Sequence, residues 1–318
     1  EKVLPLQSGM KVALTGDMAD SHKILGGWTL DGDWDATETL LSAFRRDDRI
    51  NLTSAEEADV ILYAVGEDEF ETGEGGSKAR PWLTDAQMAE LVSLHGLGKP
   101  IVVILFTGRA MILSDVAANC DALLNAWFPG SMGAEAIRSL VMGDVSPSGH
   151  TSVTFPRSVG QIPIHHDKLS ACRHNEPWNK YSNRYVDEQN EPLYPFGYGL
   201  TYGNVAATAV TANREVAAVT VENKGNRATE DVVQLYIKDN ASSDAPTNPI
   251  LCGFKRVTLE AGESKTVEVA IDPRAFTVVN DAGERIPGSG SWTLYAGLGQ
   301  PDQRTQELTG NAAVSTQI

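Results

Sequence analysis

The sequence has no run of basic residues, and its 42 Asp and Glu outnumber its 26 Lys and Arg, which gives 318 residues a formal net charge of -16. Nucleic acids and anionic membranes attract proteins whose Lys and Arg neutralise phosphate, so this charge argues against both as partners. No stretch approaches the roughly 20 continuous apolar residues of a membrane span. We therefore expect no nucleic-acid partner and no membrane span.

Cysteine is also scarce. Cys120, Cys172 and Cys252 form no CxxC and cannot make a disulfide framework, so neither a structural zinc site nor a redox motif is indicated. We interpret them as small buried residues. No GxGxxG fingerprint follows a strand and no GxxxxGK[ST] is present, which argues against a nucleotide cofactor. We predict that the protein uses no cofactor.

Short apolar runs alternate with amphipathic segments in the first half of the chain. Continuous apolar runs predict strands of a sheet that is covered on both faces, and they lie at residues 11–15, 60–65, 100–106 and 122–127. This alternation predicts an α/β sandwich with a largely parallel sheet. Ligands of such sheets usually bind beyond the carboxyl ends of the strands.

Two helices are predicted between these strands. The first begins at Thr84-Asp85, ends before Gly96 and carries Met88, Leu91, Val92 and His95. The second runs from about residue 133 to residue 142 and is expected to turn inward Ala136, Ile137, Leu140 and Val141.

The periodicity lapses between residues 145 and 202, where prolines are frequent, and we predict a domain linker at about residues 165–200. Beyond it the apolar residues follow a period of two, with turn signals between runs at 216–221, 231–237, 265–271 and 291–296. About seven short strands in this part are typical of an immunoglobulin or fibronectin type β-sandwich. We therefore assign residues 1–200 to an α/β domain with its linker and residues 201–318 to a β-sandwich.

An acidic, glycine-bearing loop follows the second predicted strand. Its carboxylates belong to Glu67, Asp68, Glu69, Glu71 and Glu74, and the first basic residue comes only at position 78. A carboxylic acid held beside apolar or like-charged neighbours at the end of a strand could donate a proton. A solvated acidic loop is the plainer interpretation of the composition, and the spacing does not match an EF-hand calcium loop.

Two further groups of residues are weaker candidates. Trp28 and Trp34 could form an apolar platform for a sugar ring, although a core or interface position is at least as well supported. His165-His166-Asp167 could ligate a metal, but adjacent histidines point in different directions and no third ligand is obvious. We predict a structural role for the histidines and no metal site.

Several stretches follow one another in an order that points to one family. They are KVALTG at 11–16, LGGW at 25–28, AWFPG at 126–130, GDVSPSG at 143–149, VTFPRSVGQIP at 153–163, PLYPFGYGLTY at 192–202, VVQLYI at 232–237 and GFKRVTLEAGES at 253–264. Together they resemble the C-terminal part of glycoside hydrolase family 3 β-glucosidases, an α/β sandwich followed by a fibronectin III-like domain. The resemblance covers nearly the whole chain.

The resemblance implies part of a larger retaining enzyme. Such family members carry an Asp nucleophile on a preceding TIM barrel and a Glu acid/base on a loop of the α/β sandwich. Their serine-glycine-glutamate step falls here on Thr72-Gly73-Glu74, with Gln87 at the expected later position, so the resemblance implies Glu74 as the acid/base and leaves Glu71 as the fallback. Some relatives place a tryptophan of this domain at the aglycone subsite, near Trp34, which we keep as a substrate-binding candidate.

We therefore predict the C-terminal portion of a retaining β-glucosidase that acts on terminal β-D-glucosyl residues of oligosaccharides or glycosides. It would supply the acid/base but not the nucleophile, and would be inactive without the TIM barrel. The chain opens at Glu1 as if entering a fold, which we interpret as the start of a fragment or processed product. The alternative is a free-standing, non-catalytic carbohydrate-binding or protein-interaction module. The sugar, the compartment and homodimer formation are left open.

Overall fold

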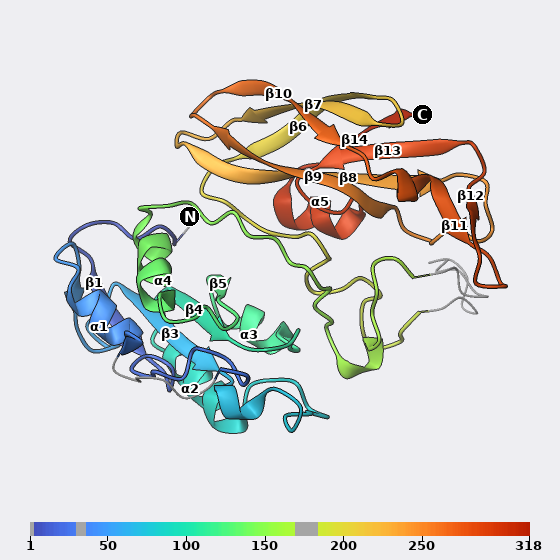
Figure 1. The fold of residues 1–318 in the computed structure, drawn as a ribbon. Coiled ribbons are helices and arrows are strands. Elements are labelled where there is room, and N and C mark those ends of the chain that lie inside the picture. The colour runs from blue at the N-terminus through green and yellow to red at the C-terminus, as the bar shows by residue number, and fades with distance from the viewer. Residues whose placement is uncertain (1–2, 30–35, 169–183) are drawn as a thin grey trace. The chain divides into compact units, whose positions relative to one another are not determined.

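The computed structural model describes residues 3–29, 36–168 and 184–318 (Figure 1). The chain divides into two compact units, Glu1–Val145 and Ser146–Ile318. This division follows packing within the chain, and the assignment of residues 1–200 and 201–318 to two domains stays a prediction. No helix in the described ranges is long and apolar enough to cross a membrane.

A five-stranded parallel sheet lies at the centre of the first unit, with the order β2-β1-β3-β4-β5. Its strands are β1 (Lys11–Thr15), β2 (Asn51–Leu52), β3 (Val60–Gly66), β4 (Ile101–Phe106) and β5 (Ala122–Asn125). Every residue of β3 and β4 is buried, which explains why both strands read as continuous apolar runs. The four predicted strands are confirmed, although β5 ends two residues earlier than predicted.

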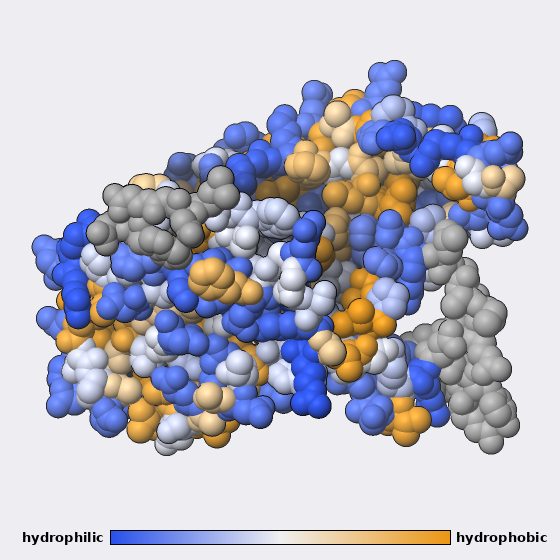
Figure 2. Space-filling view, turned by 60° about the horizontal axis from the view of Figure 1, so that its bottom comes forward, coloured by the Kyte–Doolittle hydropathy of each residue, from blue (hydrophilic) through white to orange (hydrophobic). Residues whose placement is uncertain are grey.

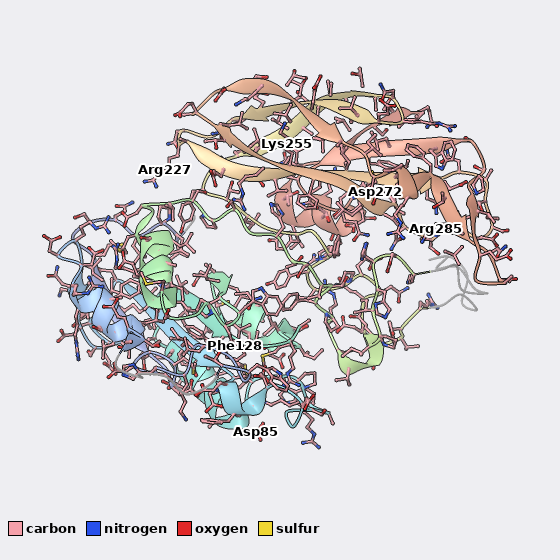
Figure 3. The ribbon with its side chains drawn as sticks, in the orientation of Figure 1. Asp85, Phe128, Arg227, Lys255, Asp272 and Arg285 are labelled. Carbon is pink, nitrogen blue, oxygen red and sulfur yellow. The ribbon has the colours of Figure 1, made fainter. Side chains whose placement is uncertain are left out.

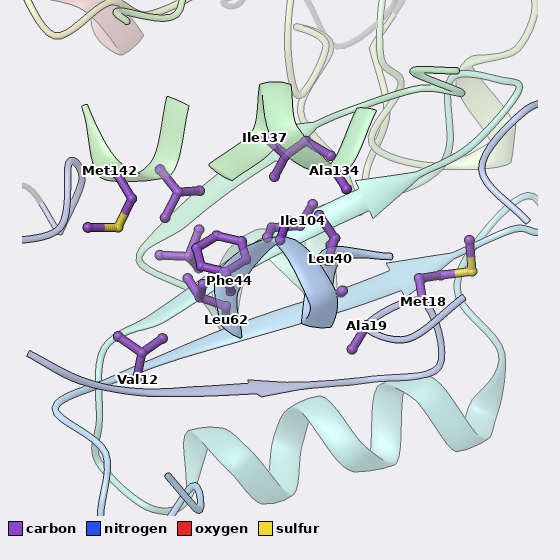
Figure 4. Close-up of a cluster of buried hydrophobic side chains, with 14 of the residues drawn as sticks. Val12, Met18, Ala19, Leu40, Phe44, Leu62, Ile104, Ala134, Ile137 and Met142 are labelled. Carbon is purple, nitrogen blue, oxygen red and sulfur yellow. The ribbon is translucent and has the colours of Figure 1, made fainter. Parts of the chain in front are cut away.

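Helices cover both faces of this sheet. Helices α1 (Leu40–Arg45) and α4 (Gly133–Met142) pack together on one face, where they meet Leu62 of β3 and Ile104 of β4 (Figure 4). Helix α2 (Asp85–His95) covers the opposite face. The short helix α3 (Ser114–Ala118) precedes β5. The predicted α/β sandwich is thereby confirmed.

Both predicted helices are present, but one orientation was wrong. Helix α2 begins at Thr84, whose side chain accepts from the backbone N–H of Gln87, while the Gln87 side chain accepts from the N–H of Thr84. Helix α4 buries Ile137 and Val141, as predicted, but Ala136 is exposed. The apolar stripe of this short helix continues to Ala134 instead, because residues three and four apart share a helix face.

The second unit contains two antiparallel sheets, β10-β7-β6 and β14-β13-β8-β9. The strands are β6 (Val205–Ala212), β7 (Val216–Asn223), β8 (Thr229–Asp239), β9 (Ile250–Leu259), β10 (Ser264–Ala270), β13 (Trp292–Gly297) and β14 (Val314–Gln317). The hairpin of β11 (Thr277–Val279) with β12 (Arg285–Pro287) and helix α5 (Gln303–Thr309) complete the unit. Inward side chains of both sheets form one core, which includes Cys252, so the predicted β-sandwich is confirmed.

Aromatic packing and backbone hydrogen bonds order the proline-rich connection after residue 145. An isolated bridge pairs Phe155 with Tyr194, and the Tyr194 ring stacks on Tyr198 with centroids 5.4 Å apart. The His166 ring stacks on Phe196 with centroids 3.8 Å apart, and the structural role of His165 and His166 stays a prediction. Part of the predicted linker, and Cys172 within it, lies outside the described residues.

Candidate functional site

The acidic loop begins at the carboxyl end of β3 and is structured from its first residues. Its next three residues after Asp68 form the 3₁₀-helix η2 (Glu69–Glu71). The Asp68 carboxylate accepts from the N–H of Phe70 at 2.9 Å, and the Glu71 carboxylate accepts from the N–H of Asp68 at 3.3 Å. These reciprocal capping bonds order this part of the loop, whereas a merely solvated acidic segment would need no such bonds.

Glu67 is the buried carboxylate of this loop, with a side chain only 1% exposed. It accepts from Thr107 Oγ1 at 2.7 Å and from Gly108 N at 3.3 Å, and it pairs with Arg109 Nε at 3.0 Å and Lys78 Nζ at 3.2 Å. Burial alone raises the pKa of Glu67, but the hydrogen bonds from Thr107 and Lys78 and the charge of Arg109 outweigh it and leave this pKa below its ordinary value. Glu67 therefore stays ionised and serves as a counter-ion.

Arg109 and Lys78 join the two ends of the loop. Arg109 Nη2 donates to the carbonyl oxygens of Glu71 at 2.8 Å and Gly76 at 2.6 Å. Lys78 Nζ lies 2.6 Å from the Glu71 carboxylate as well as beside Glu67. Burial lowers the pKa of Lys78, but its bonds to the two carboxylates raise it overall, so this ammonium stays charged. Residues 72–75 thus form a short tip on a fixed base.

The loop also packs closely on a second segment of the first unit. A Cβ atom on Gly27 would lie 2.6 Å from the Glu69 carbonyl oxygen, so only glycine permits this approach. The next residue, Trp28, is 74% exposed, and its indole Nε1 lies 3.6 Å from the position that a Cβ on Gly73 would occupy. The Gly26-Gly27-Trp28 stretch therefore lies against the base and the tip of the acidic loop.

The two candidate carboxylates of the loop differ in their surroundings. Glu74 lies at the tip, is exposed, and makes no hydrogen bond or ion pair with the residues that the structure describes. Glu71 is 37% exposed, but its carboxylate already binds Lys78 and the N–H of Asp68. The structure thus leaves the carboxylate of Glu74 available to a ligand and engages that of Glu71. The catalytic role of either residue stays a prediction.

Two exposed aromatic side chains lie at this loop. Besides Trp28, Phe70 of η2 is 69% exposed, and Lys23 Nζ lies 4.8 Å from the centre of its ring. In the space-filling view, hydrophobic residues lie among hydrophilic ones on the surface (Figure 2). Trp34, the other predicted member of the aromatic platform, lies outside the described residues.

A strained aromatic segment follows β5 at the same edge of the sheet. Trp127 has a φ of +53°, a conformation that costs a bulky residue about 1–3 kcal/mol. The ring and Cβ of the adjacent Phe128, labelled in Figure 3, lie 3.2 Å from the position that a Cβ on Gly108 would occupy and 3.4 Å from that on Gly26, respectively. The sequence indicated this segment only as a family motif, because backbone strain leaves no signal in residue type.

A cavity of about 540 Å³ opens beside the base of the acidic loop. Its lining residues are Asp17, Met18, Asp20, Ser21, His22, Lys23, Gly66, Asp68 and Glu71. Burial raises the pKa of Asp17, although a 2.8 Å hydrogen bond from Gln87 opposes the shift. In the described ranges no three His, Cys, Asp or Glu side chains group as they do around a metal ion.

Comparison with known proteins decides the family. Residues 1–202 match the family described as glycosyl hydrolase family 3 C-terminal domain, and residues 231–299 match the fibronectin type III-like domain. The chain belongs to glycosyl hydrolase family 3. The fold and the family inferred from the sequence motifs are thereby confirmed.

Relatives of this family 3 chain are longer than it is. A periplasmic beta-glucosidase of Salmonella typhimurium is 31% identical over 93% of this chain, which covers 46% of that protein. A beta-xylosidase of Formosa agariphila is 30% identical over 81% of the chain and 36% of that protein. The crystal structure of a beta-glucosidase from Listeria innocua in complex with gluconolactone matches the whole chain with a TM-score of 0.90 at 29% identity, and the match covers 46% of that structure. The chain thus spans less than half the length of these relatives.

Sequence reasoning on this family 3 chain found the acidic loop but missed Arg109 and Thr107. Parallel pairing places Gly66 opposite Phe106, so the segments that follow β3 and β4 leave the sheet side by side. Thr107 and Arg109 follow β4 directly. The sequence does carry a signal for this: residues that directly follow neighbouring parallel strands lie at the same edge of the sheet, which places Thr107 and Arg109 near Glu67.

Proposed function

We propose that this chain is the C-terminal part of a retaining β-glucosidase that cleaves terminal, non-reducing β-D-glucosyl residues from oligosaccharides or glycosides. Glu74 would be its acid/base, and a domain outside this chain would supply the nucleophile. Family membership supports the reaction class, and the names of its relatives, a beta-glucosidase and a beta-xylosidase, support β-linked sugars as substrates. The carrying observation is the unengaged carboxylate of Glu74 on a loop whose base is fixed.

The proposed roles follow from the chemistry of retention. Retaining glycosidases hold two carboxyl groups about 5 to 5.5 Å apart on either side of the glycosidic bond. Protonated Glu74 gives its proton to the glycosidic oxygen while the other carboxylate attacks the anomeric carbon and the leaving group departs. The Glu74 carboxylate then takes a proton from water, which attacks the same carbon and releases the nucleophile. Because this chain would contribute one of the two groups, we expect it to be inactive alone.

The other carboxylates of the loop fit this task less well. Glu67 is buried and has a lowered pKa, so it holds no proton to donate near neutral pH. Glu71, the fallback, would have to break its 2.6 Å contact with Lys78 before it could meet a glycosidic oxygen. The exposed indole of Trp28 beside Gly73 offers an apolar face for the departing group. Trp34 remains a binding candidate on the sequence alone.

The test uses the enzyme in which this chain is joined to its nucleophile-bearing domain. We expect Glu74→Gln to lower kcat/KM for cellobiose by about 10² to 10⁴-fold, the usual share of general acid catalysis. Azide should restore turnover of an activated glucoside and yield β-glucosyl azide, because azide attacks the glycosyl-enzyme without needing a general base. Glu71→Gln is the matched control, and we expect it to lack both signatures.

Two outcomes would contradict the proposal. The first is Glu74→Gln with wild-type activity on cellobiose, which together with sugar binding by the isolated chain would favour a non-catalytic carbohydrate-binding module. The second is robust hydrolysis of p-nitrophenyl β-glucoside by the purified 318-residue chain, because the isolated chain is expected to lack the nucleophile.

A further inference from the structure

We propose that Arg109 is the positioning residue that holds the Glu74 loop in the geometry for proton transfer, an inference that rests on the proposed function above. Arg109 lies three residues beyond β4, not in the acidic loop itself. It would not touch the substrate. Its effect would pass through the main chain of the loop to Glu74.

The contacts of Arg109 bracket Glu74 in the sequence. One nitrogen, Nη2, donates to the carbonyl oxygens of Glu71 at 2.8 Å and of Gly76 at 2.6 Å. Two backbone positions five residues apart are therefore fixed by a single atom, and the tip that carries Glu74 closes between them. A further bond from Gly76 N to the Gly73 carbonyl oxygen, at 3.1 Å, narrows the tip. The position of the Glu74 backbone is thus tied to the guanidinium.

The guanidinium is itself held in one orientation. Its Nε lies 3.0 Å from Glu67 Oε1, and that carboxylate is fixed in turn by Thr107 and Lys78. Because the guanidinium is planar, fixing Nε on Glu67 also fixes the direction of Nη2. The chain of contacts therefore runs from a buried carboxylate at the end of β3, through Arg109, to both sides of the tip.

The directions of the Arg109 hydrogen bonds, rather than its positive charge, position the loop. The four charged groups linked around Arg109 are the carboxylates of Glu67 and Glu71 and the cations of Lys78 and Arg109, and their formal charges cancel. Replacing Arg109 by lysine keeps that balance but removes the planar fork, and an ammonium cannot reach Glu67 and both carbonyl oxygens with the same directions. Arg109→Lys therefore tests the positioning while the charge is kept.

Misplacement of an acid should affect only the substrates that need one. A shift of about 1 Å in a catalytic group costs on the order of 10²-fold in rate. Cellobiose requires a proton on its departing oxygen, whereas the leaving group of 2,4-dinitrophenyl β-glucoside departs without one. A variant that is merely less folded would lose both activities in the same proportion, so the ratio of the two separates positioning from stability.

The experiment measures kcat/KM for both substrates in the complete enzyme. We expect Arg109→Lys to lower the value for cellobiose by about 10²-fold and that for the dinitrophenyl glucoside by less than about threefold. Arg138→Lys is the matched control, because Arg138 binds Asp47 and Glu135 in the same unit and no carbonyl of this loop. We expect it to leave the ratio unchanged.

A second variant approaches the same contact from the loop. A Cβ atom on Gly76 would lie 2.5 Å from the Glu71 carbonyl oxygen, so Gly76→Ala should spread the base without changing any charge and should give the same selective loss. Equal losses on both substrates in Arg109→Lys and Gly76→Ala, or no loss in either, would overturn the role of Arg109. Glu74→Gln in the same assay distinguishes failure of this inference from failure of the proposed function. If Glu74→Gln lowers only the cellobiose activity while Arg109→Lys lowers neither activity selectively, the positioning role alone is refuted. If Glu74→Gln itself shows no selectivity between the two substrates, the proposed function is refuted.

Discussion

Replacing the buried carboxylate of Glu67 by an amide should destabilise the first unit markedly. Glu67→Gln keeps the shape of the side chain and its bond with Thr107, and removes the charge. The two cations that face it, Arg109 at 3.0 Å and Lys78 at 3.2 Å, are only 24% and 22% exposed. Both would then lose their most deeply buried counter-ion.

The size of the effect can be worked from these distances. At an effective dielectric constant of about 20, each pair is attracted by about 5 kcal/mol before solvation is counted, and desolvation of the ions offsets several kcal/mol of the total. Breaking one side of a buried pair costs about 3 to 5 kcal/mol. Because Lys78 keeps Glu71 and Arg109 keeps two carbonyl oxygens, we expect the lower end, about 3 kcal/mol.

Urea denaturation of this chain, followed by circular dichroism, measures the loss, and hydrogen exchange of the β3 amides assigns it to the first unit. Glu71→Gln is the matched control, because Glu71 binds the same Lys78 but is 37% exposed, and we expect it to cost less than about 1 kcal/mol. The pKa of Glu67 is lowered by folding, so its contribution is present above the unfolded-state pKa of about 4.3 and is lost as the pH falls below that value. The difference between wild type and Glu67→Gln should therefore shrink from pH 5 to pH 3.

Two results would refute this reasoning. One is a Glu67→Gln chain whose free energy of unfolding at pH 7 stays within about 1 kcal/mol of wild type, because the pair would then contribute no more than a surface contact. The other is a loss that persists unchanged at pH 3, because below about pH 4.3 the unfolded wild-type chain binds a proton at Glu67, which must reduce the contribution of this carboxylate to stability.

Three further predictions concern the stability of the first unit, each measured by urea denaturation at pH 7. Gly76→Ala should cost about 1–3 kcal/mol, because its Cβ meets a carbonyl oxygen, whereas Gly75→Ala, whose Cβ meets nothing within 4 Å, should stay within about 0.5 kcal/mol; equal values would contradict the loop geometry. Asp47→Asn should cost about 2 kcal/mol, because this buried carboxylate binds Arg49 at 2.6 Å and its pKa is lowered in the folded chain. The cost should fade as the pH drops below about 3.9, the unfolded-state pKa of Asp, and a cost that does not change with pH would argue against an ionic origin. Thr84→Ala should cost about 1 kcal/mol by removing the cap of α2, and Thr84→Ser should restore most of it, unless the cap contributes nothing.

The sequence predicted the buried strands best, because a strand covered on both faces must be apolar throughout. Strands β3 and β4 show this pattern and were located to within one residue at each end. The edge strand β9 was not identified as a strand, because Phe254, Lys255 and Arg256 face solvent in its middle and interrupt the alternation. Helix α1, six residues long, is too short for its apolar period to be recognised.

The candidate site was predictable only in part. Crowded acidic residues identified the loop, and family resemblance, not local chemistry, singled out Glu74 within it. The buried state of Glu67 could not be read from composition, because five carboxylates in one loop look alike until the cations are placed. Those cations lie at positions 78 and 109, and the second reaches the loop only through the pairing of β3 with β4.

Arg109 binds the loop through carbonyl oxygens, which every amino acid provides. These two hydrogen bonds therefore do not depend on which side chains stand between residues 71 and 76. Sequence change at the tip can alter the surface offered to a departing group while the anchoring contacts persist. The part of the loop that can diversify is therefore separate from the part that fixes its shape. Residue 75, whose Cβ position meets nothing within 4 Å, is the position where a library of variants would sample new leaving-group preferences with little loss of folded protein.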